Sequence, residues 1–277
     1  MVRRQTANLL FVSSILTGAS FRARDRRRVA VSLLALTLGC AHTGGEASDN
    51  PRSWYVGRLR VHPVSSTPVA KGQLPGLHPL HQQDPNDAWI YVPARVADSV
   101  NVPLVVLLHG AGGTAERVIQ NLIRPADQTG MIVVAPKSRA ATWDIITGYY
   151  GPDVANIDSV LVEVTRAYSI DPRRIYLAGF SDGASYALGL GRLNGDVFSK
   201  IAAFSPGILL PVTPRGSPRI FISHGTRDQI LPIEQASRRF VPELRRQGFK
   251  VEYREFDGPH AMPPEIADAA ARWLIAR

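Results

Sequence analysis

The sequence lacks the features that mark several protein classes. It has one cysteine, Cys40, and no clustered spacing of His, Cys or Asp that would suggest a metal site. It contains no internal repeat and no low-complexity tract. With 277 residues, of which 45% are hydrophobic, the chain is long enough to bury a full core. We therefore expect a globular protein that needs no metal.

Basic charge outside the N-terminus is almost balanced by acidic charge. The formal net charge of the whole chain is +9, but residues 1–39 hold seven Arg and one acidic residue. The remainder, residues 40–277, has 25 basic and 22 acidic side chains, a net charge of +3, and no long basic run. This distribution is typical of an ordinary solvated surface and predicts no nucleic-acid partner.

The N-terminal segment resembles a targeting sequence. Basic residues 22–28 precede the apolar run Val29–Leu38, which is too short to span a bilayer, and Cys40 follows it. A cysteine there resembles the lipid-modified residue of bacterial lipoprotein signals, although Thr37 stands where Leu is usual. We expect residues 1–39 to be a signal, residues 40–53 a polar tether and the protein to be exported. Lipidation of Cys40, plain cleaved secretion and an uncleaved anchor remain the alternatives.

The segment Gly179-Phe-Ser-Asp-Gly183 predicts a nucleophile elbow. It lies between a short apolar run and a stretch that is typical of a helix. A sharp turn from strand to helix strains the backbone of Ser181, and flanking glycines avoid collisions there. The hydroxyl of Ser181 is then held at a helix N-terminus, where N–H groups favour an oxyanion.

Candidates for the acid and the base follow in the order that α/β-hydrolases use. The predicted strand Pro218–Ser223 leads to Asp228, and the predicted strand Phe249–Phe256 leads to His260. A serine hydroxyl needs a base that is oriented by a carboxylate. The order Ser181, Asp228, His260, each residue following a strand, predicts a catalytic triad.

Three other polar residues compete for roles in this site. Asp257 is the rival of Asp228, but it lies three residues before His260, where it is expected to cap a turn. His109 is expected to shape a loop, and His224 to pack beneath the site.

The predicted strand Val102–Leu108 runs into a glycine-rich loop, residues 109–113. The N–H groups of Ala111 and Asp182 are the candidate oxyanion donors, with Gly112 as a substitute for Ala111. The same loop also fits the dinucleotide fingerprint G-x-G-x-x-A, which requires an acidic residue after the next strand. The stretch that contains the next predicted strand, residues 131–137, offers none, so we expect no cofactor.

Strands and helices alternate along the rest of the chain. Further predicted strands are Trp54–His62 and Ala88–Val92 at the edge, Ile132–Pro136 and Ile201–Phe204, with residues 63–87 as an irregular connection. Predicted helices are Thr114–Gln128, Asp153–Tyr168, Glu234–Gln247 and Pro264–Ile275. This pattern predicts one α/β domain over residues 54–277, with about eight mostly parallel strands and helices on both faces.

The motifs resemble two families of α/β-hydrolase esterases, over about Trp89 to Arg277. One is the polyhydroxybutyrate depolymerase and feruloyl esterase type, through Tyr91–Pro93, His109-Gly110, Asp158, Asp171–Tyr176 and Gly179–Gly183. The other is the phospholipase/carboxylesterase type, through His224–Asp228, Leu231-Pro232 and Gly258–His260. Asp182 departs from both, since the first often has Asn there and the second Gln.

The sequence also indicates the kind of substrate. Residues 138–155 carry Trp143, Tyr149 and Tyr150, which could form an aromatic wall over the site or pack only the loop. Only 13 residues separate Phe204 from Pro218, where many lipases carry a helical lid. We expect a serine esterase with an open, shallow site that takes short-chain or small chain-like esters. A prolyl-oligopeptidase-like peptidase and a catalytically silent surface lipoprotein remain as alternatives.

Overall fold

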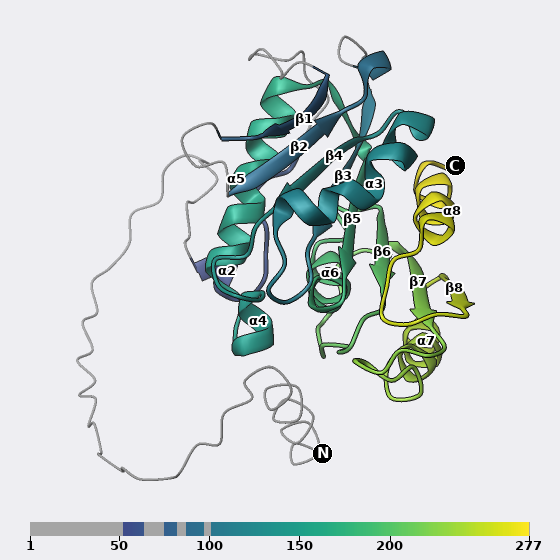
Figure 1. Cartoon of the computed structure of the whole chain (residues 1–277). Coiled ribbons are helices and arrows are strands. Elements are labelled where there is room, and N and C mark those ends of the chain that lie inside the picture. The colour runs from purple at the N-terminus through teal and green to yellow at the C-terminus, as the bar shows by residue number, and fades with distance from the viewer. Residues whose placement is uncertain (1–51, 64–74, 82–86, 97–100, 277) are drawn as a thin grey trace, which may run out of the picture. The chain divides into compact units, whose positions relative to one another are not determined.

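The computed structural model describes residues 52–63, 75–81, 87–96 and 101–276, which belong to one compact unit that begins at Arg52 (Figure 1). The expected signal, residues 1–39, and Cys40 lie outside the described residues. None of the helices in the described ranges is long and apolar enough to cross a membrane.

The described residues form an eight-stranded sheet of mostly parallel strands. Its order is β1-β2-β4-β3-β5-β6-β7-β8; β2 pairs antiparallel with both of its neighbours, β1 and β4, and the remaining neighbouring strands pair parallel. The strands are β1 (Gly76–Pro79), β2 (Ala88–Val92), β3 (Val102–Leu108), β4 (Ile132–Pro136), β5 (Ile170–Phe180), β6 (Lys200–Phe204), β7 (Arg219–Gly225) and β8 (Val251–Phe256). The parallel strands carry their carboxyl ends to one edge, where open α/β sheets place their sites.

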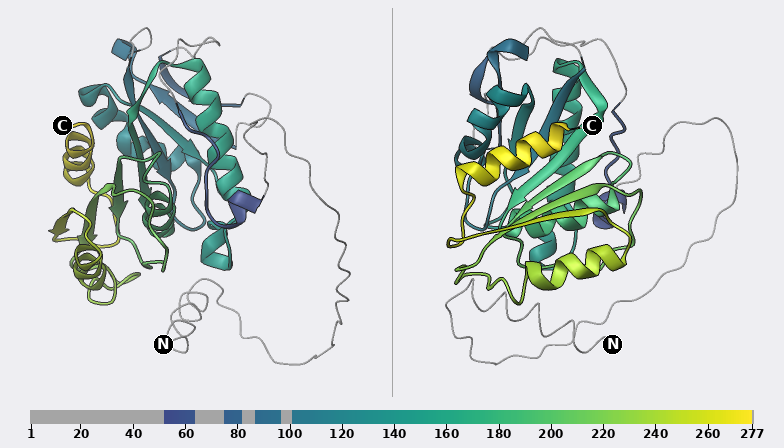
Figure 2. Two further views of the ribbon diagram at one scale, coloured as in Figure 1. Left: turned by 180° about the vertical axis from the view of Figure 1, so that it is seen from behind. Right: turned by 90° about the vertical axis from the view of Figure 1, so that its right-hand side faces the viewer.

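Helices cover both faces of the sheet. They are α2 (Arg52–Tyr55), α3 (Ala115–Thr129), α4 (Asp144–Thr147), α5 (Pro152–Ala167), α6 (Asp182–Leu193), α7 (Ser237–Arg246) and α8 (Pro264–Ile275), with a 3₁₀ turn at Ala94–Val96. Helices α3 and α8 pack into one apolar cluster, and α5, α6 and α7 into another on the opposite face. In Figure 1 helix α3 lies in front of the sheet, whereas α5 lies in front in the reverse view of Figure 2. The α/β-hydrolase architecture that the sequence predicts is confirmed.

The continuous apolar runs form strands because both faces of the sheet are covered. All seven residues of β3 and all five of β4 are buried, as expected for central parallel strands. Helix α3 begins after Thr114, whose side chain accepts the N–H of Arg117 as an N-cap, and ends at Gly130 in the left-handed conformation.

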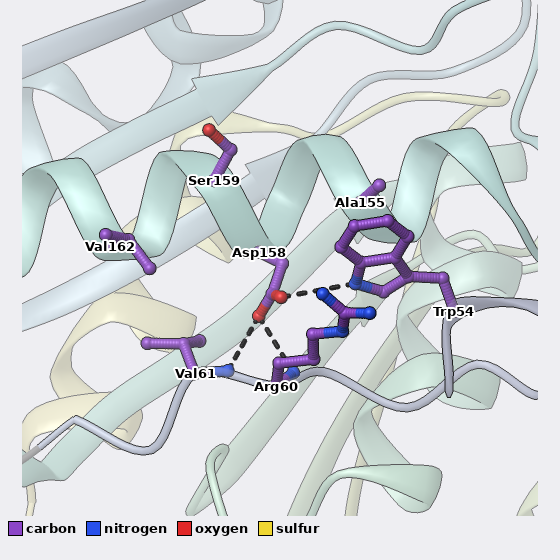
Figure 3. A pocket seen from close by; sticks show the side chains of 7 residues that line it. All are labelled: Trp54, Arg60, Val61, Ala155, Asp158, Ser159 and Val162. Carbon is purple, nitrogen blue, oxygen red and sulfur yellow. Dashed lines mark hydrogen bonds between the residues drawn. The ribbon is translucent and has the colours of Figure 1, made fainter. Parts of the chain in front are cut away.

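The predicted strand Trp54–His62 is wrong. Its first residues form α2, and the backbone that follows is held by helix α5 instead of by a neighbouring strand. The Asp158 carboxylate accepts the N–H groups of Arg60 and Val61 at 3.0 and 2.9 Å and the Trp54 indole N–H at 3.2 Å (Figure 3). These bonds satisfy partly buried backbone N–H groups that a strand would otherwise satisfy by pairing.

An open cavity of about 460 Å³ lies at this contact between residues 54–61 and α5. Its lining consists of Trp54, Arg60, Val61, Ala155, Asp158, Ser159 and Val162 (Figure 3). None of the residues predicted to be catalytic lines it.

The expected irregular connection, residues 63–87, contains strand β1. This strand pairs with β2 from Gly76 opposite Val92 to Pro79 opposite Trp89, so β1 and not β2 is the edge of the sheet. A four-residue strand that begins with glycine and ends with proline has no alternation for a sequence pattern to detect. Proline is tolerated there because an edge strand leaves part of its backbone unpaired.

The connection from β6 to β7 is short and irregular. Residues 205–218, all described, contain no helix, as the predicted absence of a large lid requires.

Candidate active site

The turn between β5 and α6 has the geometry of the predicted elbow. Ser181 has φ 58° and ψ −120°, a conformation that residues other than glycine rarely adopt. A Cβ added to Gly179 would lie 2.2 Å from the carbonyl oxygen of Gly183, and one on Gly183 would lie 2.5 Å from the carbonyl oxygens of Leu108 and His109. Both glycines are therefore required for the strand, the helix and β3 to approach so closely.

The three residues predicted to form a triad lie in one hydrogen-bonded chain. His260 Nε2 lies 2.9 Å from Ser181 Oγ, and His260 Nδ1 lies 2.6 Å from Asp228 Oδ2. Because a carboxylate only accepts, Nδ1 carries the proton and Nε2 is free to accept the serine hydroxyl. The Asp228 side chain is fully buried, whereas that of His260 is 13% exposed, so the chain runs from the interior to the surface.

The loops that carry Asp228 and His260 pack against each other. Gly225, the last residue of β7, packs so closely on the loop before His260 that an added Cβ would lie 2.4 Å from the carbonyl oxygens of Gly258 and Pro259. The Asp228 carboxylate is fixed on its other oxygen, Oδ1, by the N–H groups of Ile230 and Leu231 at 2.9 and 2.8 Å.

Asp257 lies apart from this chain. Its side chain is 80% exposed and pairs with the Arg227 guanidinium at 3.0 Å. Of the two carboxylates weighed in the sequence, only Asp228 contacts His260.

The glycine-rich loop after β3 lies directly beside the serine, since a Cβ on Gly110 would lie 3.1 Å from that of Ser181. Among the described residues, the N–H groups of Ala111 and Asp182 have no acceptor, as an oxyanion site requires. The N–H of Gly112 donates to the carbonyl of Ala141 at 2.7 Å, so it is not available as the substitute donor.

His109 is a structural residue of this loop. It is 1% exposed, and burial lowers its pKa. Its Nε2 accepts the backbone N–H of Ser138 at 3.0 Å, so the proton is on Nδ1, which donates to the Gly110 carbonyl at 2.7 Å. Both nitrogens are occupied, and the ring ties the loop to the end of β4.

The expectation of an aromatic wall formed by three rings needs correction. Trp143 is fully buried, with its indole N–H donating to the His109 carbonyl at 2.8 Å, and it packs on the ring of Tyr186. Tyr150 is also buried, whereas Tyr149 is 67% exposed. Trp143 and Tyr150 are part of the core because large rings gain more from burial than from exposure. Tyr149 alone of the three presents its ring to solvent.

The Asp182 side chain has an unusual environment for a carboxylate. It is 7% exposed, and its Oδ2 accepts the Thr142 hydroxyl at 2.7 Å. Burial raises its pKa. Thr142 was not identified from the sequence, because this contact joins residues that are 40 positions apart and follows no motif.

Comparison with known proteins places these motifs in a family. The family model described as "Esterase PHB depolymerase" matches residues 88–250. The bifunctional acetylxylan esterase/xylanase XynS20E of Neocallimastix patriciarum is 28% identical over 177 residues, which are 61% of this chain and 24% of that protein. Feruloyl esterase B of Thermothelomyces thermophilus is 32% identical over 126 residues, 42% of this chain and 43% of that protein. The chain thus spans less than half the length of either relative.

Solved structures share the fold. Esterase PE8 is similar with a TM-score of 0.56 at 22% identity, covering 67% of this chain and 95% of that one. The ferulic acid esterase AmCE1/Fae1A of Anaeromyces mucronatus gives a TM-score of 0.51 at 20% identity, covering 66% and 81%.

We expect Asp182→Asn to raise the melting temperature at pH 7 by a few degrees. For a domain of this size, that corresponds to about 1 kcal/mol in the free energy of unfolding. The amide keeps an oxygen for the Thr142 hydroxyl and removes a charge that burial penalises. Since the folded-state pKa of Asp182 is raised above the ordinary 3.8, its ionisation costs stability as pH rises through that folded value. The gain over wild type should therefore grow from pH 4 to pH 7 in thermal unfolding. Asp257→Asn, at an exposed carboxylate, is the control and should change little; a gain independent of pH would contradict the explanation.

Proposed function

The chain belongs to the Esterase PHB depolymerase family, and from this premise we propose that it is a serine esterase that hydrolyses carboxylic esters. The observation that carries the proposal is the hydrogen-bonded chain from Ser181 through His260 to Asp228. A serine hydroxyl is a weak nucleophile and becomes a strong one only beside such an oriented base.

The first half of the proposed reaction forms an acyl-enzyme. His260 Nε2 takes the hydroxyl proton as Ser181 Oγ bonds to the acyl carbon, and the carbonyl oxygen becomes an oxyanion. The N–H groups of Ala111 and Asp182 donate to this oxyanion. The bond to the alcohol then breaks, the alcohol leaves with the proton from Nε2, and the acyl group stays on Oγ.

The second half releases the acid. Water gives a proton to His260 Nε2 and attacks the acyl carbon, which forms a second oxyanion on the same two N–H groups. The bond to Oγ breaks, and the proton returns from Nε2 to Ser181. Throughout, the Asp228 carboxylate stabilises the protonated ring of His260.

Short-chain or small chain-like esters are the proposed substrates. The absence of a helix over residues 205–218 supports an open site, which offers little apolar surface to a long acyl chain. The names of two relatives specify an acetyl and a feruloyl ester, both with compact acyl groups. We propose that Tyr149, with its exposed ring, contacts the substrate.

Export is the proposed location, with residues 1–39 as the signal, residues 40–53 as a tether and residues 54–277 as the catalytic domain. The basic and apolar regions before Cys40 support this division. A lipid on Cys40 would attach the enzyme to a membrane surface.

Ser181→Ala should lower kcat by about 10³-fold or more, because triad residues act as a unit. The smaller side chain fits the same turn, so circular dichroism and the melting temperature should stay close to wild type. The measurement is p-nitrophenyl acetate hydrolysis; activity within tenfold of wild type would show that Ser181 is not the nucleophile.

Asp228→Asn should lower kcat by about 10⁴-fold, because an amide favours the wrong tautomer of His260. Asp257→Asn is the matched variant, with the same chemical change at an exposed carboxylate, and should stay close to wild type. Steady-state kinetics of both variants test the choice of the acid, which the reverse ranking would refute.

Activity should stop rising once the acyl chain outgrows the site, near butyrate or hexanoate. Each methylene that remains in water loses up to ~0.8 kcal/mol of burial. A panel of p-nitrophenyl esters from acetate to palmitate measures this limit, and Tyr149→Ala should raise KM more than it lowers kcat. A steady increase to palmitate would refute the open site, and preference for an added aminoacyl-anilide would favour a peptidase.

Cys40 is expected to become the lipidated N-terminus in a bacterium with intact lipoprotein processing. Mass spectrometry of the membrane fraction should find the acylated cysteine, and Cys40→Ala should abolish it. A soluble product cleaved elsewhere would favour ordinary secretion.

A further inference from the structure

A second histidine contacts the carboxylate of Asp228. His224 lies near the end of β7 and is fully buried. Its Nε2 is 3.1 Å from Asp228 Oδ2, the same oxygen that faces His260 Nδ1, and 2.8 Å from the carbonyl oxygen of Leu231. On the other side of the ring, Nδ1 is 2.7 Å from Ser237 Oγ, at the start of α7.

These contacts determine where the His224 ring carries its proton. Nε2 faces two oxygens that only accept, so it must be the N–H donor. In a neutral ring Nδ1 then accepts, and the hydroxyl of Ser237 can donate to it. Burial lowers the pKa of His224, which favours this neutral form.

With His224 included, four N–H groups lie against the Asp228 carboxylate. Oδ1 accepts the N–H groups of Ile230 and Leu231, and Oδ2 accepts His260 Nδ1–H. The His224 Nε2–H, which donates to the Leu231 carbonyl, also faces Oδ2, with the nitrogen 3.1 Å away. These contacts leave the carboxylate little freedom to rotate.

We propose that His224 is a positioning residue, which holds the Asp228 carboxylate in the plane that His260 requires by donating its Nε2–H to Oδ2. The inference rests on the proposed esterase function. It goes beyond the triad, because His224 touches neither Ser181 nor the position of the substrate and acts only through Asp228.

The test compares two variants that differ in reach. In His224→Gln the side-chain amide nitrogen can occupy the position of Nε2 and donate to Asp228. In His224→Asn the amide is one methylene shorter and reaches only the position of Nδ1, near Ser237. Both variants introduce the same polar group into the same buried site, and the melting temperature of each reports any loss of the contacts to Leu231 and Ser237 separately from the loss of kcat.

We expect His224→Asn to lower kcat by 10-fold to 100-fold with KM within about twofold, as positioning errors of about 1 Å do. His224→Gln, by contrast, should keep most of the activity. Rates are taken per active site, counted by burst titration, so that partial unfolding does not count as lost catalysis. Equal kinetics in the two variants, whether wild-type or impaired, would overturn the inference.

Ser181→Ala separates this outcome from failure of the proposed function. If that variant is inactive and wild type is active, the esterase proposal stands whatever the His224 variants do. If Ser181→Ala keeps its activity, the function itself is refuted.

Discussion

The close approach of three backbones around Ser181 is the constraint on which the candidate active site depends. The end of β3, the end of β5 and the start of α6 meet where a Cβ on Gly179 or Gly183 would overlap carbonyl groups. The strained conformation of Ser181, of order 1–3 kcal/mol for such residues, is maintained by the burial of β5 and α6. The same approach brings the N–H groups of the loop after β3 beside the serine.

Buried carboxylates hold the loops around this centre in place. Asp153 accepts the N–H groups of Arg139 and Asp144 at 2.6 and 2.7 Å, and burial raises its pKa to about 6. The loop that it orders carries Ala141, which accepts the N–H of Gly112, and Trp143, which donates to His109. Asp228 has a similar role beside His260, where its carboxylate accepts the N–H groups of Ile230, Leu231 and the His260 ring. The positions of donors and acceptors in the site thus depend on carboxylates that accept several N–H groups at once.

Local patterns in the sequence are sufficient to predict much of the fold. The ranges of β2, β3, β4 and α8 agree with prediction residue by residue, because apolar runs bounded by Gly, Pro and charged residues are local signals. The strand predicted for residues 54–62 was wrong because the alternation of polar and apolar residues there reflects contact with α5. A sequence pattern shows which residues are covered and does not identify the element that covers them. Strand β1 was missed because its pairing with β2 is its only reason to be extended.

The sequence by itself determined the glycine-flanked turn at Ser181, the order of Ser181, Asp228 and His260, and the parallel sheet, because glycine spacing and hydrophobic periodicity act over a few residues. The sequence favoured Asp228 over Asp257 because Asp257 lies only three residues before His260, and the tertiary structure brings the Asp228 carboxylate to the His260 ring. The tertiary structure also decided that Trp143 is a core residue and that His224 shares an oxygen with His260. Burial and hydrogen bonding between residues distant in the chain are properties of the packed molecule, which no local pattern contains.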